Sequence, residues 1–112
     1  MEGASMTKHN GKYYLQYAAP GTQFNVYADV VYIGETPLGP FSYMKSNPMS
    51  FKPGGFTNGA GHGITVKQTN DQYWHFATMA LASNSQWERR LCMFPTYFDD
   101  EGLMFSNTDY GD

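Results

Sequence analysis

The sequence predicts an all-β fold made of antiparallel four-stranded units, the kind that form the blades of a β-propeller. Three observations lead to this prediction. The 12 Gly and 6 Pro are spread along the 112 residues and leave no long window of helix-forming residues. Turn signals divide the chain into short strand-like segments. The two halves of the chain also show the same succession of strands and turns.

The first half begins with the pattern of a β-hairpin. Asn10-Gly11 tolerates the positive φ angles of a two-residue turn, and residues 5–9 and 12–18 on either side favour strands. A third strand is expected over residues 27–34. A short fourth strand is expected over residues 41–44, after Pro40, a residue that suits the edge of a sheet.

The second half repeats this order after a polar connection at residues 45–61. Strands are expected at residues 64–68, 73–79, 90–94 and 103–106. An offset of 60 residues aligns matching residue types, namely Gly3 with Gly63, Asn10 with Asn70 and Tyr13 with Tyr73. We therefore predict two blades, residues 1–59 and residues 60–112.

Two blades cannot close a propeller. Each blade buries its faces only against its neighbours, and a ring takes about 4 to 8 of them. We therefore expect the chain to be part of a larger domain whose remaining blades are missing from this chain. Assembly from several copies of the chain, and a mistaken repeat, are the alternatives.

The apolar residues predict an unusual core. Phe, Tyr and Trp number 19 and Met numbers 7, whereas Leu, Ile and Val together supply 11 residues. A core built mainly from aromatic rings and thioethers follows. The aromatic content and the net charge of -3 argue against a disordered chain.

Charge and cysteine content exclude several classes of protein. Seven basic against ten acidic residues, with no basic cluster longer than Arg89-Arg90, argue against nucleic-acid binding and against a basic membrane patch. The sequence has no apolar run long enough for a spanning helix and no signal-peptide pattern at its start. The single Cys92 excludes an internal disulfide and a thiolate metal cluster, and no base lies near it in the sequence to make it a nucleophile.

The candidate site lies where the innermost strands begin. In a propeller these strands line the central channel, so polar residues at their starts converge on the axis. The offset of 60 places Glu2 on His62, a carboxylate on an imidazole. Each residue also has a simpler interpretation that does not involve a site. Glu2 could be a solvated carboxylate near a terminus, and His62 could be a residue of a glycine-rich loop that tolerates positive φ.

Several motifs together resemble the last two blades of glycoside hydrolase family 43. They are Glu2-Gly3-Ala4-Ser5-Met6-Thr7-Lys8, Gly11-Lys12-Tyr13-Tyr14-Leu15-Gln16-Tyr17, Pro37-Leu38-Gly39-Pro40-Phe41, Gly61-His62-Gly63 and Glu88-Arg89-Arg90. The resemblance implies a five-bladed β-propeller, of which about two blades are present. It also implies an inverting glycosidase acting on arabinose- or xylose-containing glycans, with arabinofuranosidase or xylosidase activity.

The resemblance assigns a role to each candidate residue. Glu2 matches the general acid that protonates the glycosidic oxygen. His62 matches a histidine near a cation, commonly calcium held mostly through water, because calcium prefers oxygen ligands. One of Arg89 and Arg90 is expected to reach the sugar. Alternation along a strand sends these two to opposite faces, and the sequence does not decide between them. A carbohydrate substrate and no organic cofactor are expected.

The sequence also departs from the family pattern. No residue matches the catalytic base or the aspartate that tunes the acid, so the chain alone is predicted to be inactive. Gly3-Ala4-Ser5 lacks an aromatic often found after the acid, and Ile64 replaces a small hydroxyl residue. A non-catalytic carbohydrate-binding or scaffold propeller is the alternative function. The family resemblance implies a secreted or periplasmic protein.

Two further features have structural interpretations. Asp99-Asp100-Glu101-Gly102 resembles part of a calcium loop but lacks its ligand spacing, so an acidic turn is expected. His75 lies within a predicted strand and is expected to be a packed residue rather than a metal ligand.

Overall fold

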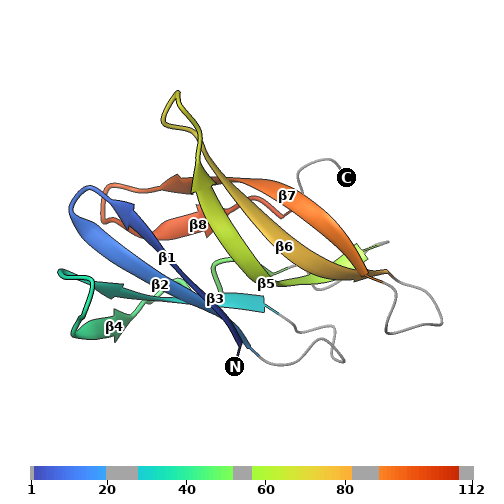
Figure 1. The fold of residues 1–112 in the computed structure, drawn as a ribbon, viewed down its shortest axis with the longest axis horizontal. Coiled ribbons are helices and arrows are strands. Elements are labelled where there is room, and N and C mark those ends of the chain that lie inside the picture. Colours follow the sequence, from blue (N-terminus) through green and yellow to red (C-terminus); the bar gives the residue numbers. More distant parts are fainter. Residues whose placement is uncertain (1, 20–27, 52–56, 82–88, 109–112) are drawn as a thin grey trace.

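The computed structural model describes residues 2–19, 28–51, 57–81 and 89–108. They form two four-stranded antiparallel sheets that lie side by side (Figure 1). The strands are β1 (Glu2–His9), β2 (Lys12–Ala19), β3 (Ala28–Gly34), β4 (Phe41–Tyr43), β5 (Thr57–Lys67), β6 (Tyr73–Leu81), β7 (Arg89–Phe98) and β8 (Met104–Ser106). The predicted all-β fold with two four-stranded units is confirmed. Within the described residues, no helix is long and apolar enough to cross a membrane.

The first sheet has the order β1-β2-β3-β4. His9 pairs with Lys12 across the predicted two-residue turn, where Asn10 and Gly11 have φ angles of 49° and 77°. The short strand β4 pairs only with β3 and forms the edge of the sheet, directly after Pro40 as expected. The turn chemistry of the sequence therefore fixes where this sheet begins and ends.

The second sheet has the order β5-β6-β7-β8, but its first strand is longer than predicted. β5 begins at Thr57 and takes in a glycine-rich stretch that lacks strand-favouring residues. The repeat also shifts by one residue within the hairpin. Tyr13 pairs with Lys8 and Tyr73 pairs with Lys67, so the offset is 60 on the second strand and 59 on the first. A longer turn between β5 and β6 accounts for the difference.

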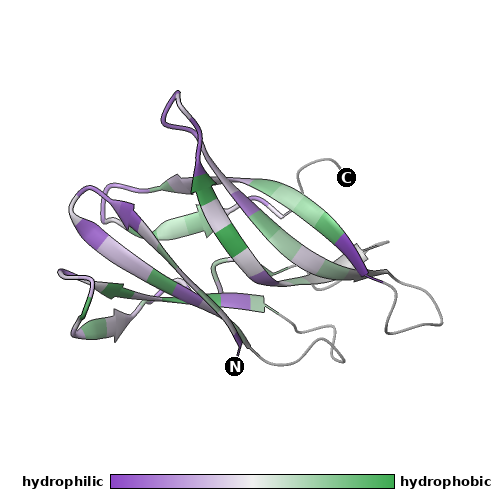
Figure 2. Cartoon of the chain, viewed as in Figure 1, coloured by the Kyte–Doolittle hydropathy of each residue, from purple (hydrophilic) through white to green (hydrophobic). Residues whose placement is uncertain are grey.

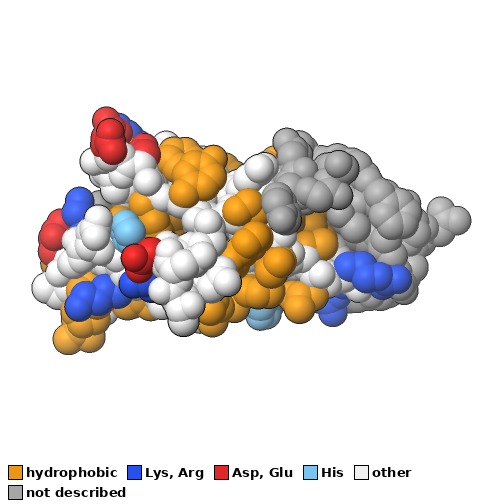
Figure 3. Space-filling model, turned by 90° about the horizontal axis from the view of Figure 1, so that it is seen from above, with side chains coloured by type: hydrophobic (Ala, Val, Ile, Leu, Met, Phe, Trp, Pro, Cys, Tyr) orange, Lys and Arg blue, Asp and Glu red, His pale blue; other side chains and the backbone are white. Residues whose placement is uncertain are grey.

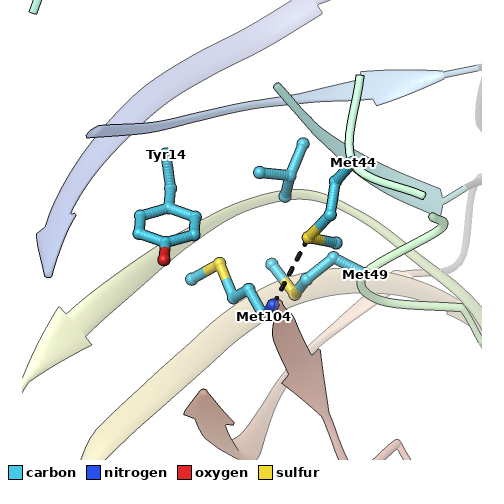
Figure 4. Close-up of a cluster of buried hydrophobic side chains, with 5 residues drawn as sticks. Tyr14, Met44, Met49 and Met104 are labelled. Carbon is cyan, nitrogen blue, oxygen red and sulfur yellow. Dashed lines mark hydrogen bonds between the residues drawn. The ribbon is translucent and has the colours of Figure 1, made fainter. Parts of the chain in front are cut away.

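The largest hydrophobic cluster lies between the two sheets. Met44 and Met49 come from the connection between the sheets, Met104 from β8, and Tyr14 and Val31 from the first sheet (Figure 4). All five side chains are buried. The amide of Met104 donates to the Met44 thioether at 3.3 Å. The prediction of a core rich in thioethers and aromatic rings is confirmed. Methionine suits this position, because its flexible side chain can fill the irregular space between two twisted sheets.

Strand alternation divides the residues between this interior and the outer faces. Figure 2 shows hydrophobic segments recurring along β5 and β7, whereas the turns at the ends of the β1–β2 and β5–β6 hairpins are hydrophilic. The two hairpin ends are linked by aromatic contacts. The His9 ring stacks on Phe98 with centroids 3.8 Å apart, and its Nδ1 lies 3.1 Å from the Tyr73 hydroxyl.

Truncation of a methionine in the core should destabilise the protein. Met104→Ala removes a fully buried side chain that contacts both sheets. We expect a loss of about 2–5 kcal/mol in the free energy of unfolding, measured in urea, because the cavity cannot collapse completely. Met6→Ala, at a position that is 43% exposed, is the matched control and should cost much less. Equal losses for the two variants would contradict the assignment of this core.

Stability should also depend on the protonation of His9. Burial and the nearby Lys67 ammonium lower its pKa, and Asp71 partly opposes them. The unfolded chain therefore binds the proton more readily. Neutral His9 therefore contributes to the free energy of unfolding above about pH 6.5, the pKa of an unfolded histidine. This contribution is lost as the pH falls through the lowered pKa of the folded state.

His9→Phe keeps a ring on Phe98 and removes the titration. We expect its free energy of unfolding to depend less steeply on pH than that of the wild type in mildly acidic urea titrations. His62 and His75 are present in both proteins, so their contributions cancel in the comparison. Identical pH profiles would rule out this role for His9.

Candidate active site

Glu2, at the start of β1, lies next to His62, in the middle of β5. The Glu2 Oε1 atom is 3.4 Å from the His62 Nδ1 atom, and the two side chains are 54% and 50% exposed. β1 and β5 run side by side, and the Ser5 hydroxyl donates to the Gly63 carbonyl at 3.4 Å. A carboxylate and an imidazole therefore share one open site, as the sequence predicted.

The alignment that predicted this contact is not the one that the sheets adopt. Glu2 pairs with Ala18, and Gly61 pairs with Thr78, so Gly61 is the positional equivalent of Glu2. Both first strands have irregular pairing close to this point. The contact with His62 is thus made between strands with local bulges, which often redirect side chains at functional sites.

The backbone around His62 has an uncommon conformation. His62 has a φ angle of 56° and Ala60 one of 90°. Positive φ is unfavourable for residues other than glycine, at a cost of roughly 1–3 kcal/mol each. The simpler interpretation of His62 as a residue that tolerates positive φ is correct for its backbone. It does not conflict with the contact that the ring makes with Glu2.

Gly3 provides the surface on which the His62 ring rests. A Cβ atom at this position would lie 2.6 Å from the His62 Cδ2 atom, and Gly3 itself has a φ angle of 65°. Both the shape and the backbone conformation therefore require glycine. The ring is thus placed by contact with the residue that follows Glu2.

A row of buried polar side chains lies behind the site. Asp29 Oδ2 accepts hydrogen bonds from the Gly63 amide at 2.9 Å and from His75 Nε2 at 2.7 Å. The other ring nitrogen of His75 lies 3.0 Å from the Thr65 hydroxyl, which donates to Gln16 at 3.2 Å. Asp29 and His75 are almost completely buried. His75 is a packed strand residue, as expected, but its hydrogen bonds join the two sheets.

Asp29 was not singled out from the sequence, although a signal was present. On the predicted strand over residues 27–34, Asp29 shares a face with Val31 and Ile33. A carboxylate on an apolar face needs a partner inside the protein. The pattern does not identify that partner, because His75 comes from a distant strand.

The two arginines lie at the start of β7 and are exposed. Arg90 pairs with Met79 and Arg89 pairs with Ala80. Directly paired residues share a face of the sheet, so Arg90 is on the side of buried Met79 and Arg89 is on the opposite side. β7 is separated from the strand of His62 by β6.

The described residues do not form a metal cage by themselves. They contain no group of three or more His, Cys, Asp or Glu side chains placed to hold a metal ion. Calcium prefers six to eight oxygen ligands, and Glu2 and His62 supply only one carboxylate and one imidazole. Calcium near His62 thus requires water and further groups, and it remains a prediction.

The chain matches a known protein family. The family model of glycosyl hydrolases family 43 matches residues 1–104. No curated protein matches the chain.

Solved structures share the fold of this chain over almost its whole length. An endo-1,4-beta-xylanase from Bacteroides thetaiotaomicron is 24% identical with a TM-score of 0.83, and the match covers 95% of this chain and 37% of that protein. The GH43 protein BlXynB from Bacillus licheniformis is 23% identical with a TM-score of 0.85, covering 97% and 22%. A xylan beta-1,4-xylosidase from Bacillus halodurans is 22% identical with a TM-score of 0.81, covering 98% and 22%. The chain thus spans well under half of each of these proteins.

The packing of His62 on Gly3 gives a direct test of the site. In Gly3→Ala, the new methyl group should push the imidazole away from Glu2, which NMR contacts between the His62 ring and residues 2 and 3 would report. Gly11→Ala is the matched control, since Gly11 also has positive φ (77°) but has open space around it. Both variants should lose about 1–2 kcal/mol in the free energy of unfolding, because alanine is unfavourable at positive φ. Only Gly3→Ala should move the ring, and an unmoved ring would contradict the contact.

Proposed function

Because the chain belongs to glycosyl hydrolases family 43, we propose that it supplies the acid-bearing part of an inverting glycoside hydrolase. In this proposal Glu2 is the general acid and protonates the glycosidic oxygen as the bond breaks. The observation that carries the proposal is the contact between Glu2 and His62 on the adjacent strands β1 and β5, with both side chains open to a ligand.

The proposed reaction needs a second carboxylate from outside this chain. Inverting enzymes place the acid and the base roughly 6.5–9.5 Å apart, so that a water molecule fits between the base and the sugar. No residue here matches that base. The side chain of Glu2 is also half exposed, so the dry surroundings that suit a general acid must come from surfaces beyond these two sheets.

Exposed apolar residues support the presence of further blades. The outer face of the second sheet carries exposed hydrophobic side chains, namely Ile64, Val66, Leu91 and Met93. Val66 and Met93 also line an apolar hollow of about 370 Å³ together with Trp74 and Phe76. Figure 3 shows hydrophobic side chains gathered in the middle of one face of the molecule. Patches of this kind mark interaction surfaces, and we propose that another blade covers this one.

The substrate in this proposal is a glycan that contains xylose or arabinose. Its support is the family and the structural neighbours, which include a xylanase and a xylosidase. One of Arg89 and Arg90, both exposed at the start of β7, is proposed to reach the sugar. A calcium ion near His62, bound mostly through water, belongs to the same proposal.

The acid is tested in a completed propeller, in which this chain follows the preceding blades from its own reading frame or from a family 43 relative. We expect Glu2→Gln to lower kcat on xylan- or arabinan-derived oligosaccharides by about 10²- to 10⁴-fold, because the leaving group loses its proton donor. The loss should be smaller for aryl glycosides, whose leaving groups need less protonation. Glu35→Gln, at an exposed position in the first sheet's loop, is the matched control and should retain activity.

The chain by itself is expected to show no hydrolysis, since the base is missing. Unaltered turnover in Glu2→Gln would disprove the acid assignment. A completed wild-type propeller that binds these glycans without hydrolysing them would favour the non-catalytic carbohydrate-binding alternative.

A further inference from the structure

The backbone at residues 60–62, within β5, is strained and needs support from neighbouring segments. Ala60 and His62 both have positive φ, and pairing with β6 is irregular on either side of Gly61. Such conformations persist only where the surrounding structure fixes them. The position of the His62 ring therefore depends on what holds the backbone next to it.

Besides the Ser5 contact with the Gly63 carbonyl, two hydrogen bonds from the first half of the chain hold this segment. The Asp29 carboxylate accepts from the Gly63 amide at 2.9 Å, and the Ser50 hydroxyl donates to the Ala60 carbonyl at 3.0 Å. The two anchors are joined to each other, because the Asp29 amide donates to the Ser50 carbonyl at 3.0 Å. Both are buried. They attach to the chain on either side of His62.

The contact with Gly63 is fixed by shape as well as by hydrogen bonding. A Cβ atom at Gly63 would lie 2.2 Å from the Phe76 carbonyl oxygen, 2.6 Å from His75 Nε2 and 2.7 Å from Asp29 Oδ2. Only glycine allows the carboxylate to approach the backbone this closely. The Gly63 amide therefore cannot move without displacing Asp29.

Asp29 is itself held in place by the second sheet. His75 Nε2 lies 2.7 Å from the same carboxylate oxygen that binds Gly63. The other oxygen, Oδ1, is buried and has no hydrogen-bond partner among the described residues. Burying a carboxylate oxygen without a hydrogen-bond partner costs free energy. A buried group of this kind in a folded protein calls for an explanation, and a role at the site would supply one.

We propose that Asp29 is a positioning residue for His62. Its carboxylate, oriented by His75, fixes the Gly63 amide and so sets the imidazole of the preceding residue against Glu2. The structural part of this inference stands on the contacts above. Its effect on turnover rests on the proposed function.

The structural part is tested by comparing Asp29→Asn with Asp29→Ala in the completed propeller. Asparagine keeps an acceptor oxygen for Gly63, whereas alanine removes it. Crystal structures should show His62 at positive φ and close to Glu2 in the wild type and in Asp29→Asn, and displaced in Asp29→Ala. An unmoved His62 in Asp29→Ala would overturn the proposal.

A second measurement covers the case in which Asp29→Ala does not fold. In the wild type, the Gly63 amide should exchange slowly with deuterium, because its proton is bound to a buried carboxylate. In Asp29→Asn, this amide should exchange faster but stay protected. A wild-type Gly63 amide that exchanges as fast as an unbonded one would also overturn the proposal.

The kinetic test separates positioning from general loss of stability. Per folded molecule, we expect Asp29→Ala to lower kcat roughly 10- to 100-fold, with KM changed less than about twofold and with Asp29→Asn largely restoring kcat. Asn47→Ala is the control, since the Asn47 side chain hydrogen-bonds the Val31 backbone of the same sheet at 2.7 and 2.8 Å. An equal loss of kcat in Asn47→Ala would contradict a positioning role. If no protein, wild type included, hydrolyses glycosides, the proposed function fails while the structural comparison still decides the role of Asp29.

Discussion

One buried carboxylate joins the two sheets. Asp29 belongs to β3 of the first sheet, and the groups that donate to it, the Gly63 amide and the His75 ring, belong to β5 and β6 of the second. Leaving a buried polar group without its hydrogen-bond partner costs about 1–3 kcal/mol, because the protein interior cannot replace the bonds that water would make. This penalty favours the one arrangement of the sheets in which Glu2 and His62 also meet.

Polar and apolar parts of the sheet-to-sheet contact have different roles. Thr65, Gln16 and His75 form directional bonds, so they fix how the strands lie relative to one another. Met44, Met49 and Met104 fill the remaining volume, and their flexible side chains accept many geometries. A chain with few branched aliphatic residues can therefore still hold two twisted sheets in a single arrangement.

The sequence predicted those features that depend on local chemistry. Asn10-Gly11 marked a turn, Pro40 marked a sheet edge, and the repeat placed Glu2 near His62, although its offset on the first strand was one residue too large. The link between Asp29 and His75 was not predicted, because single residues 46 positions apart leave no periodic pattern. The early start of β5 was missed for another reason. Its glycine-rich residues have low strand propensity, and their conformation is imposed by neighbouring segments.

The uncovered outer faces have a consequence for the chain when it is purified alone. Ile64, Val66 and Leu91 are exposed on one sheet, and Met6 and Tyr43 are exposed on the other. If the face of one copy covers the different face of the next, the contact is heterologous, and such contacts extend indefinitely unless the rotation closes a ring. A contact between two identical faces would instead be isologous and would end at a dimer.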